Sequence, residues 1–198
     1  MTFLEPVVLE GDHVALEPLS HGHHDGLVEA VRDGDLWNLW YTRIPRPESM
    51  RDEIDARLAQ QRAGTMLPFT TRQIATGQVV GMTTFCNADA ASPRVEIGAT
   101  WLARSVQGTA LNAEAKLLML RHAFDEWGCI AVEFRTHWMN QQSRAAIAGL
   151  GAKQDGVLRS HTRMPDGSLR DTVIFSIIAT EWPTVRANLQ HRLTPDVG

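Results

Sequence analysis

The residues ahead of a long predicted helix hold the first candidate for chemistry. They form the loop Gln107-Gly108-Thr109-Ala110, rich in small side chains. A helix N-terminus carries unpaired N–H groups and a partial positive charge, so successive amides there can hold a pyrophosphate without a lysine. A plain strand–loop–helix connection that needs one glycine explains the same residues.

A second candidate lies further along the chain. Asn140 follows a predicted strand over 130–138, and Ser143 falls in the first turn of the next helix. In open sheets, ligands gather outside the carboxyl ends of strands. Asn140 could therefore bond a ligand amide, and Ser143 could donate to a sulfur or a phosphate oxygen. Alternatively, Asn140 only caps the helix, which is a common position for asparagine.

The elements that must position these residues follow from hydrophobic periodicity and turn signals. Hairpins mixed with helix crossovers predict an α+β domain over 1–198, with a mixed, mostly antiparallel central sheet flanked by helices. Strands are expected over 7–18 (or a hairpin around Gly11-Asp12), 66–75, 78–86, 94–102, 130–138, 153–162 and 169–178. Helices are expected from Ser20 to 32, from Pro47 to 62, over 109–127 and 141–150, and after a capping Thr180.

Composition excludes several classes of function. The chain has 198 residues and a net charge of −4, with no long basic run, which argues against nucleic acid as a partner. It has no apolar stretch approaching the roughly 20 residues that span a bilayer, and its N-terminus is not typical of a signal peptide. The two cysteines form no CxxC pair. We therefore expect a single-domain cytoplasmic protein with no membrane partner and with reduced thiols.

Four features together resemble the GNAT N-acyltransferase superfamily, in particular the branch with the ribosomal-protein-alanine and -serine N-acetyltransferases. They are the segment QGTALNAEAKLLMLRHAF, Asn140-x-x-Ser143 followed by AIAGLGA, the closing PDGSLRDTVIFSI, and the order of elements along nearly the whole chain. The resemblance implies a GNAT-like fold and an acyl-CoA-dependent N-acyltransferase with no metal.

The resemblance also implies where acyl-CoA binds. The sheet would splay between 94–102 and 130–138, and the pantetheine arm would enter that opening. The implied cofactor ligands are main-chain groups near Thr100, Trp101 and Leu102, the amides of Gln107, Gly108, Thr109, Ala110, Leu111 and Asn112, and the side chains of Asn140 and Ser143.

Three positions depart from the family pattern. The pyrophosphate loop has Ser105 where relatives carry arginine or glutamine. Ile147 stands where many relatives have a tyrosine that protonates the leaving thiolate, and Gly151-Ala152 replaces Gly-Phe. The one tyrosine in the chain is Tyr41, far away in sequence.

Proton transfer needs other candidates, and we consider two. Glu96 is the candidate base, because Glu96, Gly98 and Thr100 would share one face of a strand that borders the opening. A solvated strand glutamate is the alternative. Ser143 is the candidate acid that the resemblance implies, and the alternative is a serine that only bonds the cofactor.

The acceptor amine would meet aromatic and histidine side chains. Trp37, Trp40 and Tyr41 resemble an acceptor wall, with core packing as the alternative for at least one tryptophan. His137 and His161 could face the cleft as a base or an amine partner, or be ordinary exposed histidines. The cluster of His21, His23 and His24 lacks the cysteine or carboxylate pattern that would complete a metal site.

The leading hypothesis is transfer of an acetyl group from acetyl-CoA to a primary amine, a protein N-terminus or a small amine, by direct attack in a ternary complex. A larger donor such as succinyl-CoA is an alternative. A non-catalytic acyl-CoA-binding or sensing module and an interaction domain that has lost CoA are others. The closing hairpin and the last helix could form a homodimer surface.

Overall fold

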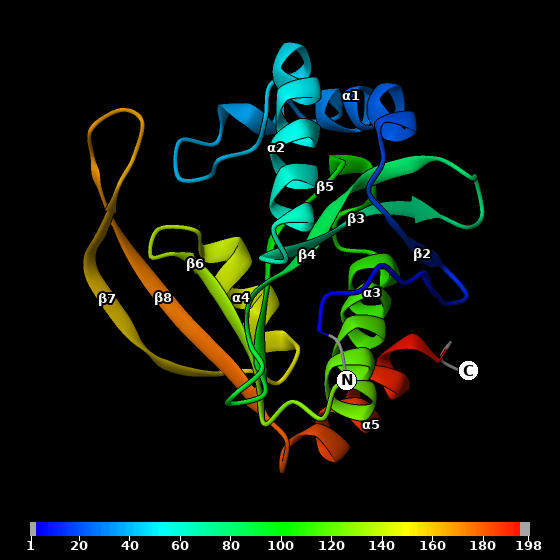
Figure 1. Ribbon diagram of the computed structural model, residues 1–198, viewed down its shortest axis with the longest axis vertical. Coiled ribbons are helices and arrows are strands. Elements are labelled where there is room, and N and C mark those ends of the chain that lie inside the picture. Colours follow the sequence, from blue (N-terminus) through cyan, green and yellow to red (C-terminus); the bar gives the residue numbers. More distant parts are fainter. Residues whose placement is uncertain (1–2, 195–198) are drawn as a thin grey trace.

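The computed structural model describes residues 3–194, which form five helices around an eight-stranded sheet (Figure 1). The strand order is β1-β2-β3-β4-β5-β6-β8-β7. The strands are β1 Leu9–Glu10, β2 Val14–Pro18, β3 Met66–Gln73, β4 Val79–Asp89, β5 Arg94–Leu102, β6 Ala131–His137, β7 Lys153–Arg163 and β8 Leu169–Ile178. The helices are α1 His24–Arg32, α2 Met50–Arg62, α3 Ala110–Arg121, α4 Gln141–Gly149 and α5 Trp182–Leu193.

The predicted α+β fold is confirmed. β5 and β6 run parallel, while the other neighbouring strands pair antiparallel. The predicted helix over 109–127 is α3 followed by a π-helical turn, His122–Glu126. The expected start of the last helix is wrong: Glu181, not Thr180, is the N-cap residue of α5.

The helices cover the sheet from both sides. Thr84 of β4 accepts a hydrogen bond from Arg57 of α2 at 2.7 Å. Its neighbour Phe85 packs on Trp127, just beyond α3, with ring centroids 4.8 Å apart. Because successive side chains of a strand point to opposite faces, α2 and α3 lie on opposite faces of the sheet.

Helix α3 is buried on most of its circumference, against the sheet on one side and α5 on the other (Figure 1). Glu114 is one of its buried residues, at 6% exposed. Its carboxylate accepts the main-chain N–H groups of Asp12, His13 and Val14 at 2.7–2.9 Å. These three hydrogen bonds offset the cost of burying the charge and attach the β1–β2 hairpin to α3.

The sheet opens between β5 and β6. The two strands pair only over Arg94–Glu96 and Ala131–Glu133, and beyond these pairs they separate. A strand pair that stops after three residues leaves main-chain groups without sheet partners on both edges of the gap. The opening between 94–102 and 130–138 is therefore present, and it defines the place where a ligand can enter the sheet.

A bulge in β5 lies at this opening. Met82 of β4 faces Trp101 and Thr84 faces Gly98, so a step of two residues in β4 matches a step of three in β5. Ala99 takes the extra position, with a φ of +48° that side-chain-bearing residues seldom adopt. The bulge reverses the alternation of side chains after Gly98.

The expectation that Glu96, Gly98 and Thr100 share one face is consequently wrong for Thr100. The Thr100 hydroxyl accepts a hydrogen bond from Lys116 of α3 at 2.9 Å. Glu96 instead accepts one from Asn87, on the face covered by α2. One extra residue thus directs two polar groups of the same strand to opposite sides of the sheet.

Candidate active site

A cavity of about 490 Å³ occupies the opening between β5 and β6. Its lining comes from both strands, from α3 and α4, from the β7–β8 hairpin and from the loop between α1 and α2. A second cavity of about 210 Å³ shares Thr100, Trp101, Asn140 and Ser143 with the first and extends to Gly108. The lining residues of the two adjoining cavities together extend from the predicted pyrophosphate loop at Gly108 to Glu96.

The loop ahead of α3 has the geometry of an anion site. Gly108 has a φ of +76°, and a Cβ atom there would have no heavy atom within 4 Å, so the space beside it is open. Within residues 3–194, the amides of Gly108, Thr109 and Ala110 donate to no acceptor. Thr109 is the N-cap of α3. Three unpaired amides beside a helix N-terminus are suited to phosphate oxygens.

The flanking residues of this loop have structural roles as well. Gln107 donates from its side chain to the carbonyl of Leu102 at 2.8 Å, which fixes the loop to the end of β5. The side chain of Leu111 is buried in the core, and Asn112 lines both cavities. A ligand at this loop would therefore meet main-chain groups and the side chain of Asn112.

Asn140 and Ser143 come from the junction of β6 and α4. Asn140 Oδ1 accepts the amide of Ser143 at 3.0 Å, so the capping interpretation of Asn140 holds. Both residues also line both cavities, so capping does not exclude ligand binding. In the described part of the chain, the Ser143 hydroxyl forms no hydrogen bond, and the buried indole N–H of Trp101 has no acceptor.

Glu96 is 8% exposed and lines the larger cavity, which favours the site interpretation over a solvated strand glutamate. Its Oε2 accepts a hydrogen bond from Asn87 Nδ2 at 2.7 Å and lies 3.3 Å from Arg135 Nε. Burial raises the pKa of Glu96, while Asn87 and Arg135 oppose the rise. A carboxylate with a raised pKa is suited to accept a proton near neutral pH.

The residues predicted to bind the acceptor amine lie in three different environments. Tyr41 and His137 line the larger cavity, and their ring centroids lie 6.4 Å apart. Trp40 is 54% exposed and packs edge-on against His137 at 5.3 Å between centroids. Trp37 packs against the hydrophobic core, in line with the core alternative. The fold thus brings the distant Tyr41 to the cavity.

The imidazole of His137 has a defined tautomer when neutral. Its Nδ1 accepts the amide of Met139 at 3.0 Å, so the ring proton is on Nε2. Burial and the charge of Arg170 lower the pKa of His137, while Asp171 opposes this. Nε2 is buried and has no partner within the described residues. His137 therefore offers a hydrogen-bond donor rather than a base.

Lys116 is a cavity residue that the sequence prediction missed. It is 5% exposed and donates to the hydroxyls of Thr83 and Thr100, both at 2.9 Å. Burial lowers its pKa to about 7. Its signal in the sequence was a single cation within the apolar run EAKLLML, but the pattern does not tell which face of the helix meets a cavity.

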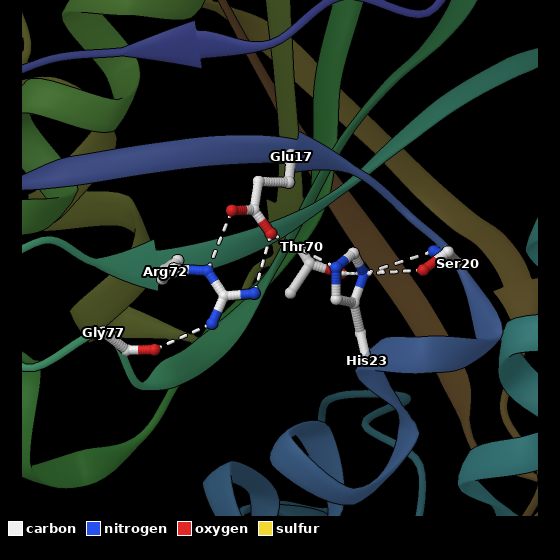
Figure 2. Close-up of polar contacts among 6 residues, drawn as sticks. All are labelled: Glu17, Ser20, His23, Thr70, Arg72 and Gly77. Carbon is white, nitrogen blue, oxygen red and sulfur yellow. Dashed lines mark hydrogen bonds and ion pairs between the residues drawn. The ribbon is translucent and has the colours of Figure 1, made fainter.

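His23 belongs to a structural network (Figure 2), while His21 pairs with Asp55 and His24 with Asp25. His23 Nδ1 lies 3.2 Å from the amide of Ser20 and 2.8 Å from the Thr70 hydroxyl, and Nε2 lies 3.2 Å from Glu17. Glu17 also accepts two hydrogen bonds from Arg72 at 2.8 Å. Residues 3–194 contain no group of three or more side chains placed to hold a metal ion.

No helix in the described part of the chain is long and apolar enough to cross a membrane.

Comparison with known proteins identifies the family. The model of the acetyltransferase (GNAT) domain matches residues 13–153. The chain therefore belongs to the GNAT acetyltransferase family, whose members use acyl-CoA, and it is an N-acetyltransferase. No curated protein matches the chain.

Solved structures agree with this assignment. A putative acetyltransferase is 32% identical, with a TM-score of 0.83 over 98% of this chain and 97% of that chain. A GCN5-related N-acetyltransferase from Brucella melitensis is 27% identical, with a TM-score of 0.87 over 97% and 87%. Mycobacterium smegmatis RimJ, solved in complex with CoA-disulfide, shares the fold at 23% identity and a TM-score of 0.80 over 94% and 95%.

Proposed function

We propose that this chain acts as one catalytic unit that transfers an acetyl group from acetyl-CoA to a primary amine by direct attack in a ternary complex. The observation that carries the proposal is the pair of adjoining cavities at the β5–β6 opening, with Gly108 and its unpaired amides at the smaller one and Glu96 at the larger one. The two ends match the two substrates: a diphosphate needs N–H donors, and an ammonium needs a base.

The donor is held by main-chain groups in this proposal. The diphosphate of acetyl-CoA binds the amides of Gly108, Thr109 and Ala110. The pantetheine arm follows β5 past Thr100 and Trp101 to the bulge, with Asn140 beside it. The bulge at Ala99 interrupts the β4–β5 pairing, and in this proposal a main-chain N–H beside it polarises the thioester carbonyl.

The chemistry then requires one bond exchange and two proton transfers. The amine nitrogen attacks the thioester carbon, the C–N bond forms, and the C–S bond breaks. Glu96 takes the proton that the attacking amine must lose. Ser143 lies at the cavity, its hydroxyl without a hydrogen-bond partner among residues 3–194, and it donates a proton to the leaving thiolate while it takes a replacement proton from solvent. Positioning of the two reactants contributes several kcal/mol of the barrier reduction.

The test is release of free thiol from acetyl-CoA in the presence of a panel of amines, with CoA affinity measured by calorimetry. We expect CoA to bind and at least one primary amine to be acetylated. CoA binding without turnover on any amine would contradict the transfer proposal and support a sensing module. Absence of CoA binding would contradict both.

A further inference from the structure

The acceptor half of the cavity is strongly basic, although the whole chain carries a net charge of −4. Among residues 3–194, five cationic side chains line the larger cavity, against one carboxylate, Glu96. The cations are Arg43, Arg57, Lys116, Arg135 and Arg170. This charge distribution would repel an ammonium ion. The excess of positive side chains therefore needs its own explanation.

Some of these cations are already neutralised by carboxylates. Arg57 pairs with Glu53 at 2.6 Å, and Arg135 lies within 3.3 Å of both Glu96 and Glu133. These pairs form inside the protein and leave no charge to explain, and Lys116 is only partly charged at neutral pH because burial lowers its pKa to about 7.

Arg43 and Arg170 are different. Among the described residues neither has a carboxylate within ion-pair distance. Arg170 donates to the Thr172 hydroxyl at 3.0 Å, and Arg43 donates to the carbonyl of Arg163 at 3.0 Å. Both contacts orient the guanidinium groups without neutralising them, so most of their donors remain available.

The two guanidinium groups act on one another. Burial lowers the pKa of Arg170, the charge of Arg43 lowers it further, and Glu96 opposes the change. They come from the α1–α2 loop and from β8, and Figure 1 shows the tip of the β7–β8 hairpin close to that loop. Arg43 is exposed, so water screens part of the repulsion between the two like charges, and a bound anion would relieve the rest.

A third donor lies in the same place. His137 is 5% exposed, and its Nε2–H has no acceptor within residues 3–194. Burial lowers the pKa of His137, the charge of Arg170 lowers it further, and Asp171 opposes the change; Arg170 and His137 line the same cavity. A buried donor without a partner costs free energy, and a bound acceptor would remove that cost.

We infer that Arg43, Arg170 and the Nε2–H of His137 form a subsite for a carboxylate that one of the two substrates carries. The planar guanidinium groups bind carboxylate oxygens through paired N–H donors, and the histidine adds a directional donor. The carboxylate belongs either to the acceptor amine or to the end of a dicarboxylic acyl group. This inference rests on the proposed function, because it names the substrate class of the same cavity.

Two matched comparisons separate the sources. For the acceptor, acetyl transfer to the peptide Ala-Glu-Ala-amide is compared with transfer to its neutral isostere Ala-Gln-Ala-amide. For the donor, succinyl-CoA is compared with butyryl-CoA, which lacks the carboxylate, on the neutral peptide. We expect the carboxylate to raise kcat/KM by roughly tenfold or more in one comparison, and the ratio to fall at high salt.

Variants then assign the preference to these residues. Arg170→Met and Arg43→Met should each reduce the carboxylate preference to near unity, and Arg170→Lys should restore part of it. Arg121→Met is the matched control, because this exposed arginine of α3 lies outside the cavity and should leave the ratio unchanged. Circular dichroism and thermal unfolding confirm that each variant is folded.

A second readout does not depend on turnover. Calorimetry measures binding of each peptide to CoA-saturated protein, and of each acyl-CoA to the free protein. Ratios near unity in both comparisons, or a preference that survives in both arginine-to-methionine variants, would overturn the subsite. If the wild-type protein turns over none of the substrates but still binds the carboxylate-bearing ligand more tightly than its neutral counterpart, the transfer proposal is rejected and the subsite is retained.

Discussion

The donor and acceptor ends of the two adjoining cavities are built from different chemical groups. The end near α3 presents main-chain amides of three consecutive residues, beginning at Gly108. The acceptor end presents side chains from the α1–α2 loop, β5, β6 and β8. A main-chain site depends on local conformation, whereas a side-chain site depends on how distant elements meet. The same GNAT fold can therefore keep its donor site while its acceptor site varies.

The largest effect of a single substitution is expected on CoA affinity, at the main-chain end. Gly108→Glu should weaken CoA binding about a hundredfold or more, because a carboxylate would occupy the phosphate position and repel the ligand. Gly128→Glu is the matched control: it also has a positive φ, of 62°, with no heavy atom within 4 Å of a Cβ. Calorimetry on both variants measures the difference, and equal CoA affinities would contradict the loop assignment.

A smaller effect is expected at the carboxylate of the acceptor end. Glu96→Gln should lower kcat about a hundredfold and leave CoA affinity unchanged, because only the proton acceptor is lost. Burial raises the pKa of Glu96, so wild-type kcat/KM should fall as the pH drops through a value above the ordinary glutamate range. The variant should lose this acidic limb. If the Glu96→Gln variant stays active and its kcat/KM shows the same pH profile as wild type, Glu96 is excluded as the base.

The neighbouring glycine offers a finer test of the same carboxylate. A Cβ on Gly98 would lie 2.8 Å from Glu96 Oε1, so Gly98→Ala should displace the carboxylate. We expect kcat to fall roughly tenfold while CoA affinity changes little, since misplacement of a catalytic group is costly. Combining Gly98→Ala with Glu96→Gln should add almost nothing to the loss caused by Glu96→Gln alone. Additive losses would show that the glycine acts by another route.

The smallest effect concerns stability. Because burial lowers the pKa of Lys116 to about 7, the unfolded state binds more protons than the folded state between about pH 7 and the ordinary lysine value of 10.5. Protein stability should therefore rise with pH across that window. Lys116→Met removes the charge, and Thr83 and Thr100 can still bond each other at 2.8 Å.

Thermal unfolding at pH 6 and pH 9 measures this effect. The Tm of Lys116→Met relative to wild type should be higher at pH 6 than at pH 9 by roughly 5 °C. Lys153→Met, at the exposed second lysine of the chain, should show no such dependence. A Tm difference for Lys116→Met that does not change with pH would contradict the lowered pKa.

The same contrast explains what the sequence could predict. The loop at Gly108 and the cap at Asn140 are local patterns, and both appear where they were expected. The position of Glu96 at the opening was also expected. The face on which Thr100 lies was not, because a single extra residue at Ala99 reverses the alternation of side chains along β5. A bulge of this kind depends on the register with the partner strand, so it cannot be read from the alternation of polar and apolar residues in one strand.

The roles of Lys116, Arg43 and Arg170 could not be predicted for a related reason. Each is an ordinary cation in its own segment. What distinguishes it is that, among residues 3–194, the fold places no carboxylate within ion-pair distance of it. Tyr41 is similar: it is distant in sequence from the cleft residues, and the α1–α2 loop brings it to the cavity.

The carboxylate of Glu114 has a consequence for the order in which the molecule is made. It bonds the amide of Asp12 across 102 positions of the chain. Residues 12–14 therefore leave the ribosome long before Glu114 exists, and although β2 can pair with β3 earlier, the contact of the β1–β2 hairpin with α3 cannot form until α3 has been synthesised. Contacts of such long range slow folding, and an N-terminal segment awaiting its partner is exposed to proteases and to other chains.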